Sequence, residues 1–306
     1  MKKLLMLGID FERTLACVYR GEFEGFSGGM HAIRDFERVD FGAFVGIREQ
    51  MEILYTNTQN FLQGKDSCNA LFWGARGCGK SSSMRAVLTH FLLSAPKVAI
   101  PFDEVLKNPL KSPDSHSARF ASSPQAHSAQ THSAHTQESA LLKPLRVIEI
   151  PKKSLEILPF VLDSIRELPF CFVIFCDDLA FGLNDESYKA LKSLMEGSLE
   201  AVAKNVLIYA TSNMRHLLQE SYPQDTMHTN DAQDELIALS DRFGIALGFY
   251  TLGAEEFIAL VESMGVKCTP NVRQSALNFA TQKGSRNPRI AKEFVKLHNG
   301  GLGGLL

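Results

Sequence analysis

Gly74-Ala75-Arg76-Gly77-Cys78-Gly79-Lys80-Ser81 follows the apolar run 69–73 and precedes a stretch with helical periodicity. It fits the spacing G-x-x-x-x-G-K-[ST] of loops that bind phosphate groups. Glycines let consecutive backbone N–H groups point inward, where side chains would keep a phosphate away. With a strand before it and a helix after it, this stretch predicts a nucleotide site in an α/β protein.

Each polar group of the loop has a predicted task. The loop backbone and the helix N-terminus bind phosphate oxygens, Lys80 reaches the outer phosphates, and the Ser81 hydroxyl binds Mg²⁺. The alternative is a glycine-rich turn with a surface lysine. The predicted nucleotide-binding residues of this stretch are Gly74, Ala75, Arg76, Gly77, Cys78, Gly79, Lys80, Ser81 and Ser82.

A second apolar run, 170–176, ends in the adjacent carboxylates Asp177 and Asp178. Ligands of open α/β sheets bind at the carboxyl ends of the strands. We therefore predict that Asp177 holds Mg²⁺ through water and that Asp178 orients or deprotonates an attacking water. The alternative is a solvated turn before Gly182.

The run 206–210 is followed by Thr211, Ser212 and Asn213. Asn213 would then lie at the edge of the same site, where its amide could position a water against the terminal phosphate. The alternative is an ordinary turn asparagine.

Five apolar runs, spaced by helical patterns, predict a parallel five-stranded sheet with helices on both faces. They are 69–73, 146–150, 170–176, 206–210 and 245–250. Residues 44–250 are the predicted α/β domain, and residues 1–43 an N-terminal extension. Residues 251–306 are expected to form a small all-helical lid domain, with helices starting near Thr251, Pro270 and Pro288.

Residues 101–144 are predicted to be a low-complexity, disordered insertion, because Ser, Ala, His, Gln, Thr and Pro dominate between Ser112 and Ala140. Its four histidines raise the question of a metal site. Their irregular spacing, without a cysteine or an acidic cluster, favours low complexity instead. They are His116, His127, His132 and His135.

The balance of charged residues excludes one class of nucleic-acid-binding protein. The chain has 306 residues, with 32 Lys+Arg, 34 Asp+Glu and a net charge of −2, which excludes a globally basic nucleic-acid coat. No apolar run approaches the roughly 18 residues of a membrane span. We therefore expect a cytoplasmic protein without membrane partners.

The sequence resembles the AAA+ ATPases, and closely resembles their bacterial branch of predicted ATPases known as domain of unknown function 815. The resemblance covers residues 44–100 and 145–298. Besides the phosphate loop it is carried by the segments 174–179, 187–192, 207–213 and 239–244.

The resemblance implies ATP and Mg²⁺ as cofactors and an AAA+ strand order. It implies Lys80 and Ser81 as Walker A, Asp177 and Asp178 as Walker B, and Asn213 as sensor 1. It also implies that the segment 44–48, with Val45 and Gly46, flanks the adenine base.

The same resemblance gives roles to two arginines. Arg242 falls at the arginine finger, which acts in trans and so implies a homo-oligomer, a ring or an arc. Arg289 falls at sensor 2, with Arg286 as a rival. A planar, permanent positive charge suits the charge that develops on a transferred phosphoryl group. The alternatives are a structural arginine paired with Asp241 and an exposed arginine at a helix start.

We expect an ATPase that remodels or loads a macromolecular client, with protein favoured over nucleic acid. Most AAA+ proteins carry Glu where this chain has Asp178, one methylene shorter, which leaves the hydrolysis rate open. The alternatives are a low-turnover ATP-dependent switch or scaffold and a P-loop small-molecule kinase.

Overall fold

The computed structural model describes residues 8–22, 28–36, 41–107, 141–182, 185, 187–196, 203–217 and 237–302. The four histidines of the predicted insertion lie outside these residues. The first residues of that interval are described, and they form helix α3 (Phe102–Lys107), whose Phe102 and Val105 are buried.

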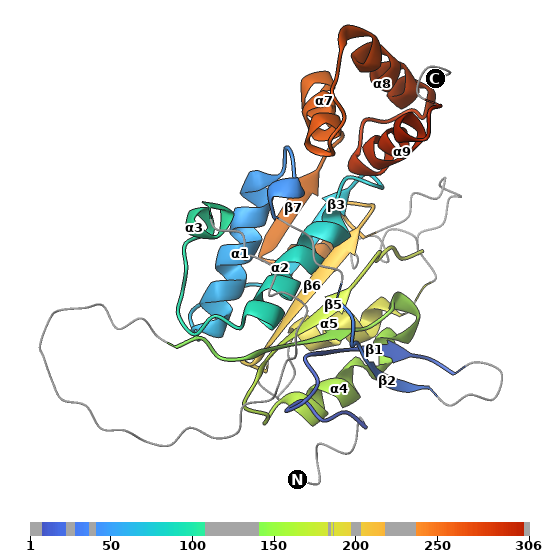
Figure 1. Ribbon diagram of the computed structural model, residues 1–306. Coiled ribbons are helices and arrows are strands. Elements are labelled where there is room, and N and C mark those ends of the chain that lie inside the picture. Colours follow the sequence, from blue (N-terminus) through green and yellow to red (C-terminus); the bar gives the residue numbers. More distant parts are fainter. Residues whose placement is uncertain are drawn as a thin grey trace, which may run out of the picture.

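A seven-stranded, mostly parallel sheet forms the centre of the α/β fold (Figure 1). Its spatial order is β2-β1-β4-β5-β6-β3-β7, and only the pair β1–β2 is antiparallel. The strands are β1 (Ala16–Arg20), β2 (Gly29–Ala32), β3 (Ala70–Gly74), β4 (Leu145–Glu149), β5 (Cys171–Cys176), β6 (Val206–Ser212) and β7 (Ile245–Phe249). The α/β class is confirmed, and all five predicted strands are present.

The predicted strand count was wrong by two, because the segment before residue 44 adds β1 and β2 to the sheet. The residues before β1 are also part of the core. Phe11 is 1% exposed and meets Phe172 edge to face, with ring centroids 5.1 Å apart. The Arg146 Nε–H donates to the carbonyl of Phe11 at 2.5 Å, so strand β4 holds this segment by a side chain as well.

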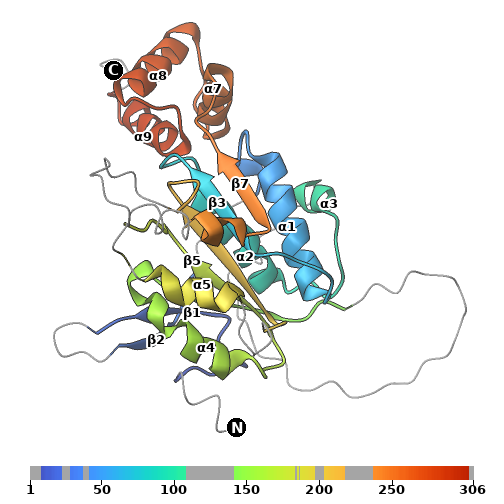
Figure 2. The ribbon, with the colours of Figure 1, turned by 180° about the vertical axis from the view of Figure 1, so that it is seen from behind.

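Helices cover both faces of the sheet (Figures 1 and 2). One face carries α1 (Arg48–Leu62) and α2 (Lys80–Ser94), and the other carries α4 (Leu158–Ile165) and α5 (Tyr188–Glu196), with the 3₁₀ helices η2 (Phe41–Ala43) and η3 (Lys152–Ile157) at their ends. Strand β5 serves both layers, since Val173 and Phe175 face α1 and α2 whereas Phe172 and Ile174 face α4 and α5. All six β5 residues are buried, which explains the continuous apolar run in the sequence.

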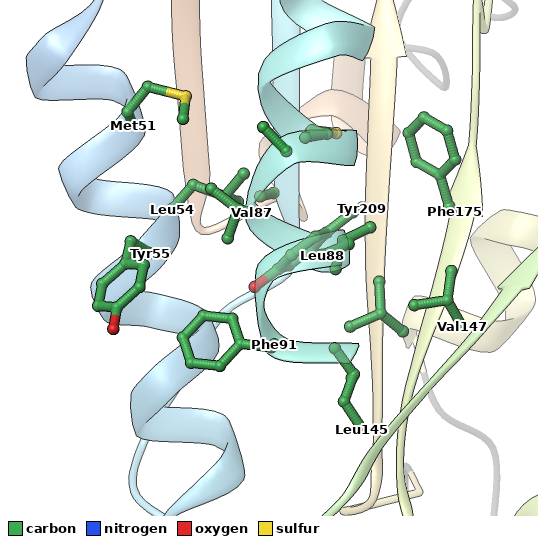
Figure 3. Close-up of a cluster of buried hydrophobic side chains, with 14 of the residues drawn as sticks. Met51, Leu54, Tyr55, Val87, Leu88, Phe91, Leu145, Val147, Phe175 and Tyr209 are labelled. Atoms are coloured by element: carbon green, nitrogen blue, oxygen red, sulfur yellow. The ribbon is translucent and has the colours of Figure 1, made fainter. Parts of the chain in front are cut away.

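The α1–α2 layer closes over the sheet with large apolar side chains (Figure 3). Tyr209 of β6 brings a buried hydroxyl into this cluster. Its hydroxyl accepts from Asn57 Nδ2 at 3.0 Å and lies 2.8 Å from Thr58 Oγ1, so it fixes α1 against β6. Burial raises the pKa of this phenol to about 12, which keeps it protonated.

Three further helices follow the sheet: α7 (Ala254–Ser263), α8 (Pro270–Gln282) and α9 (Pro288–Asn299). We call residues 251–302 the lid; it has its own apolar core around Phe257, Phe279 and Phe294. The predicted starts of α8 and α9 are confirmed, whereas α7 begins at Ala254 and not near Thr251. No helix in the described part of the chain is both long and apolar enough to cross a membrane.

The packing around Phe11 predicts that the residues before β1 stabilise the whole domain. Phe11→Ala should lower the free energy of unfolding by about 3 kcal/mol, because it removes a fully buried ring. Phe160→Ala is the matched control: Phe160 is 41% exposed, and its loss should cost less than about 1 kcal/mol. Urea denaturation followed by circular dichroism measures both, and equal effects of the two variants would contradict this packing.

Candidate functional site

The phosphate loop connects the end of β3 with the start of α2, as the sequence predicted. Its glycines have backbone angles that other residues adopt with strain: Gly74, Gly77 and Gly79 have φ of 135°, 80° and 96°. Gly74 is under a second constraint, because a Cβ there would lie 2.0 Å from the carbonyl oxygen of Phe249 in β7. The loop shape therefore depends on glycine at these positions.

Lys80 lies under this loop and is 6% exposed. Its ammonium group donates to the carbonyls of Gly74 at 2.6 Å and Ala75 at 2.8 Å, and to Asn213 Oδ1 at 3.1 Å. Burial lowers the pKa of Lys80, while the nearby Asp178 and Asp177 partly restore it. The result is a buried cation with three oxygen partners.

The remaining predicted loop residues differ in whether their side chains can reach a ligand. Cys78 is 3% exposed and its side chain packs in the core beneath α2, so only its backbone can reach a ligand. Ala75, Arg76 and Ser82 are exposed at the surface of the loop and of the first turn of α2.

Asp177 follows β5 and accepts hydrogen bonds from three side chains. Its Oδ1 accepts from Ser81 Oγ at 2.5 Å and from Thr211 Oγ1 at 2.6 Å, and its Oδ2 accepts from Arg85 Nη2 at 2.9 Å. Ser81 and Arg85 come from α2, and Thr211 from β6. The fold thus brings the two predicted metal residues, Ser81 and Asp177, into direct contact.

Asp178 takes a different direction from Asp177. Its φ of 55° is left-handed, a conformation that aspartate tolerates better than most residues, and its N–H donates to Thr211 Oγ1 at 2.9 Å. Its Oδ1 accepts from Asn213 Nδ2. Asn213 therefore joins the Lys80 ammonium to the Asp178 carboxylate, and the predicted loop, acidic and amide residues form one network.

Oxygen donors of this kind suit magnesium. Among the described residues, however, no group of three or more His, Cys, Asp or Glu could hold a metal ion. Magnesium is commonly held by one or two carboxylates together with phosphate oxygens of a substrate. Ser81 and Asp177 therefore fit a magnesium ion that arrives with a nucleotide, and they do not form a cage of their own.

The predicted base-binding segment lies between the phosphate loop and the lid. Val45 packs against the lid core, and Ile47 is 6% exposed. Gly46, with φ of 77°, lies so near the lid that a Cβ would come within 2.9 Å of Leu252 Cδ2. A Cβ on Gly79 would lie 3.8 Å from Ile47 Cδ1, so the segment also contacts the loop.

Asn287, to which no functional motif of the sequence pointed, connects the lid with the loop. It is 6% exposed and caps α9, with Oδ1 accepting from the Ile290 N–H at 3.0 Å. Its Nδ2 donates to the carbonyl of Arg76 at 3.2 Å, and a Cβ on Gly77 would lie 3.0 Å from its side chain. The Asn-Pro start of α9 was a readable cap signal, but the loop contact joins residues 211 positions apart.

The two candidate sensor arginines differ in their contacts. Arg286 donates from Nε to the carbonyl of Leu252 at 3.1 Å, and its own carbonyl accepts from the Leu252 N–H at 2.8 Å. Arg286 thereby ties the start of α9 to the segment that leads from β7 into α7. Arg289 is exposed in the first turn of α9, two residues after Asn287.

Arg242 does not join the network of its own chain's phosphate loop. Strand β7 runs parallel to β3, with Ile245 opposite Ala70 and Phe249 opposite Gly74. Arg242 precedes Ile245, so it lies at the amino edge of the sheet, whereas the loop leaves the carboxyl edge. Four residues of strand separate these edges by about 13 Å. Arg242 is exposed and lines a hollow of ≈ 490 Å³ with Met195, Ala238 and Asp241.

Comparison with known proteins identifies the family. The model of "Protein of unknown function (DUF815)" matches residues 13–110 and 124–302. The chain belongs to the DUF815 family. A comparison with curated proteins gave no match.

Several solved structures are similar to parts of this chain. The Holliday junction branch migration motor RuvB of Thermotoga maritima is 13% identical over 84% of this chain, with a TM-score of 0.46. The Aeropyrum pernix Orc1 protein in complex with DNA is 12% identical over 83%, with 0.49, and the Hsp104:casein complex of S. cerevisiae is 13% identical over 88%, with 0.48. This DUF815 chain covers 62%, 59% and 38% of their lengths, respectively.

Asn287 should contribute to stability through its cap and its loop contact. Asn287→Ala is expected to lower the free energy of unfolding by about 1–2 kcal/mol, because it removes the cap and leaves a buried N–H without a partner. Asn278→Ala is the control, since Asn278 is exposed in the middle of α8, where its Oδ1 accepts from Gln274 Nε2 at 2.9 Å. Chemical denaturation compares them, and a cost below about 0.5 kcal/mol for Asn287→Ala would contradict the assignment.

Proposed function

We propose that this protein is an AAA+ ATPase that binds Mg-ATP between the phosphate loop and the lid, hydrolyses it in an oligomer, and thereby remodels or loads a macromolecular client. The observation that carries the proposal is one hydrogen-bond network at the carboxyl ends of β3, β5 and β6. It contains Lys80, Ser81, Asp177, Asp178 and Asn213, and Thr211 joins its two acidic residues. The N-terminal end of α2 and the glycine loop add the phosphate donors.

The proposed role of each side chain follows from its observed contacts. Lys80 stabilises the outer phosphates, and Ser81 and Asp177 hold the magnesium ion, whose charge offsets that of the phosphates. Asp178 and Asn213, already hydrogen-bonded to one another, orient the attacking water. Because Asn287 contacts the phosphate loop and caps α9, nucleotide binding at the loop would shift the position of α9.

Two observations support particular arginines. Arg286 already uses its Nε and its backbone to hold Leu252, which favours Arg289 as the lid residue that meets phosphate. The position of Arg242 at the amino edge of β7 suits action on a neighbouring subunit. A finger supplied in trans requires an oligomer, and we propose a homo-oligomer, a ring or an arc.

A second candidate is a nucleotide-controlled switch with little turnover. It is favoured by Asp178, whose shorter carboxylate is already engaged by Asn213. For either function we propose a protein client, because a net charge of −2 gives no general attraction to nucleic acid.

Two variants should affect ATP binding and ATP hydrolysis separately. Lys80→Ala should weaken ATP binding at least about tenfold, because it removes a charge-assisted contact to the phosphates. Asp178→Asn should bind ATP as the wild type does and lose hydrolysis, because it removes the base but not the phosphate contacts. Titration with a fluorescent ATP analogue and phosphate release measure the two effects. Wild-type hydrolysis in Asp178→Asn would exclude Asp178 as the base and favour another water-orienting group.

The trans role of Arg242 predicts rescue between two inactive variants. Arg242→Ala should lose turnover by about 10³-fold or more while binding ATP normally. Mixed with Asp178→Asn, it should regain activity, because one subunit then supplies an intact site and its neighbour supplies the finger. Arg273→Ala is the control: this arginine pairs with Glu255 in the lid and should change neither property.

Three results would contradict the trans model: normal turnover in Arg242→Ala, no recovery in the mixture, or activity per subunit that is independent of protein concentration. The last measurement also separates the ATPase from the switch. A switch should assemble with ATP and show slow turnover at every concentration.

A further inference from the structure

Arg85 lies beside the proposed magnesium site, and the proposed reaction gives it no role. It comes one helical turn after Ser81 on α2, and its Nη2 donates to Asp177 Oδ2 at 2.9 Å. Its guanidinium carbon also lies 5.8 Å from the ring centre of Phe175 in β5. The Arg85 side chain therefore lies over the end of β5, and its guanidinium contacts the carboxylate of Asp177, the proposed magnesium ligand.

Arg85 competes with a magnesium ion for the carboxylate of Asp177. Ser81 and Thr211 occupy Oδ1, and Arg85 occupies Oδ2. A carboxylate that holds magnesium, directly or through water, needs lone pairs free for the ion or its water ligands. The guanidinium is also a positive charge in the place where a second positive charge should bind.

The ion pair is weak enough to be exchanged. The Arg85 side chain is 47% exposed and that of Asp177 is 25% exposed, so water screens the attraction. Pairs of this kind are worth about 0–1 kcal/mol, far less than a buried pair. Arg85 can therefore leave Asp177 at low cost, provided that another anion receives it.

Glu149 is that anion. It is the last residue of β4 and lies opposite Phe175, the residue over which Arg85 is laid. Burial raises the pKa of Glu149, Arg85 lowers it, and Asp177 raises it, so Arg85 interacts favourably with both carboxylates. The two carboxylates repel one another, and the positive charge of Arg85 offsets this repulsion.

We propose that Arg85 is a positioning residue that neutralises Asp177 in the metal-free protein and transfers its ion pair to Glu149 when a divalent cation binds with the nucleotide. This inference rests on the proposed function of the site. Arg85 would thereby keep the site charge-balanced in both states, and it would set how strongly nucleotide binding depends on magnesium.

The test is the magnesium enhancement, which we define as the dissociation constant of mant-ATP in EDTA divided by that in MgCl₂. Trp73 is the only tryptophan of the chain and directly precedes Gly74, so energy transfer from Trp73 to bound mant-ATP reports binding. A ratio of two constants for one variant cancels a general change in nucleotide affinity. A purely structural role for Arg85 would not alter it.

Arg85→Gln removes the competing charge and should raise the enhancement about threefold or more, the size expected for an exposed ion pair. Glu149→Gln removes the alternative partner, so Arg85 stays on Asp177 and the enhancement should fall by a similar factor. Arg273→Gln is the control, because it removes an exposed, ion-paired arginine of the lid and should leave the ratio unchanged.

An unchanged or lower enhancement in Arg85→Gln overturns the inference, as does an unchanged enhancement in Glu149→Gln. If Arg85→Gln does not fold, Arg85→Lys takes its place. It keeps the charge without the planar fork and should give a value above that of the wild type, and a value at or below it is contrary to the proposal. Wild-type protein that binds mant-ATP in neither buffer rejects the proposed function and the inference with it.

Discussion

The buried ammonium of Lys80 is the constraint around which this site is built. A charge that is 6% exposed must have polar partners, and it has three: two carbonyls of its own loop and the side-chain oxygen of Asn213. The first two require the loop to turn sharply at Gly74, where Phe249 leaves no room for a Cβ. The third requires β6 to lie next to β3. One cation thus couples the loop conformation to the strand order, and the strand order brings Asp177 and Asp178 to the same edge.

The sequence was sufficient for the parallel core and for most of the network. Buried parallel strands are continuous apolar runs, and polar residues directly after them must meet at the carboxyl edge. Strands β1 and β2 were missed because they are partly exposed. Strand β1 is identified by its pairing with β4, more than 120 positions away in sequence, and β2 by its antiparallel pairing with β1. Thr211, Arg85 and Asn287 were missed for a related reason. Each acts through a partner distant in sequence, and no local spacing predicts such a partner.

The start of α7 illustrates how a cap depends on backbone geometry. Thr251 looked like a capping residue with Glu255 and Glu256 behind it. The helix instead starts after Gly253, whose N–H donates to Glu256 Oε2 at 2.8 Å. Leu252, the residue before Gly253, is 6% exposed, and its carbonyl accepts from Arg286 Nε just ahead of α9. Tertiary contacts of the segment between β7 and α7 therefore decide where the helix begins.

The same reasoning applies to aspartate at position 178. Its backbone is left-handed, which orients its N–H toward Thr211 Oγ1 and its carboxylate toward Asn213. Aspartate adopts this conformation more readily than glutamate, because its short polar side chain can compensate the strain locally. A longer side chain would gain reach and lose this backbone preference. The turn after β5 therefore favours aspartate at position 178, and Asn213 bridges its carboxylate to the Lys80 ammonium.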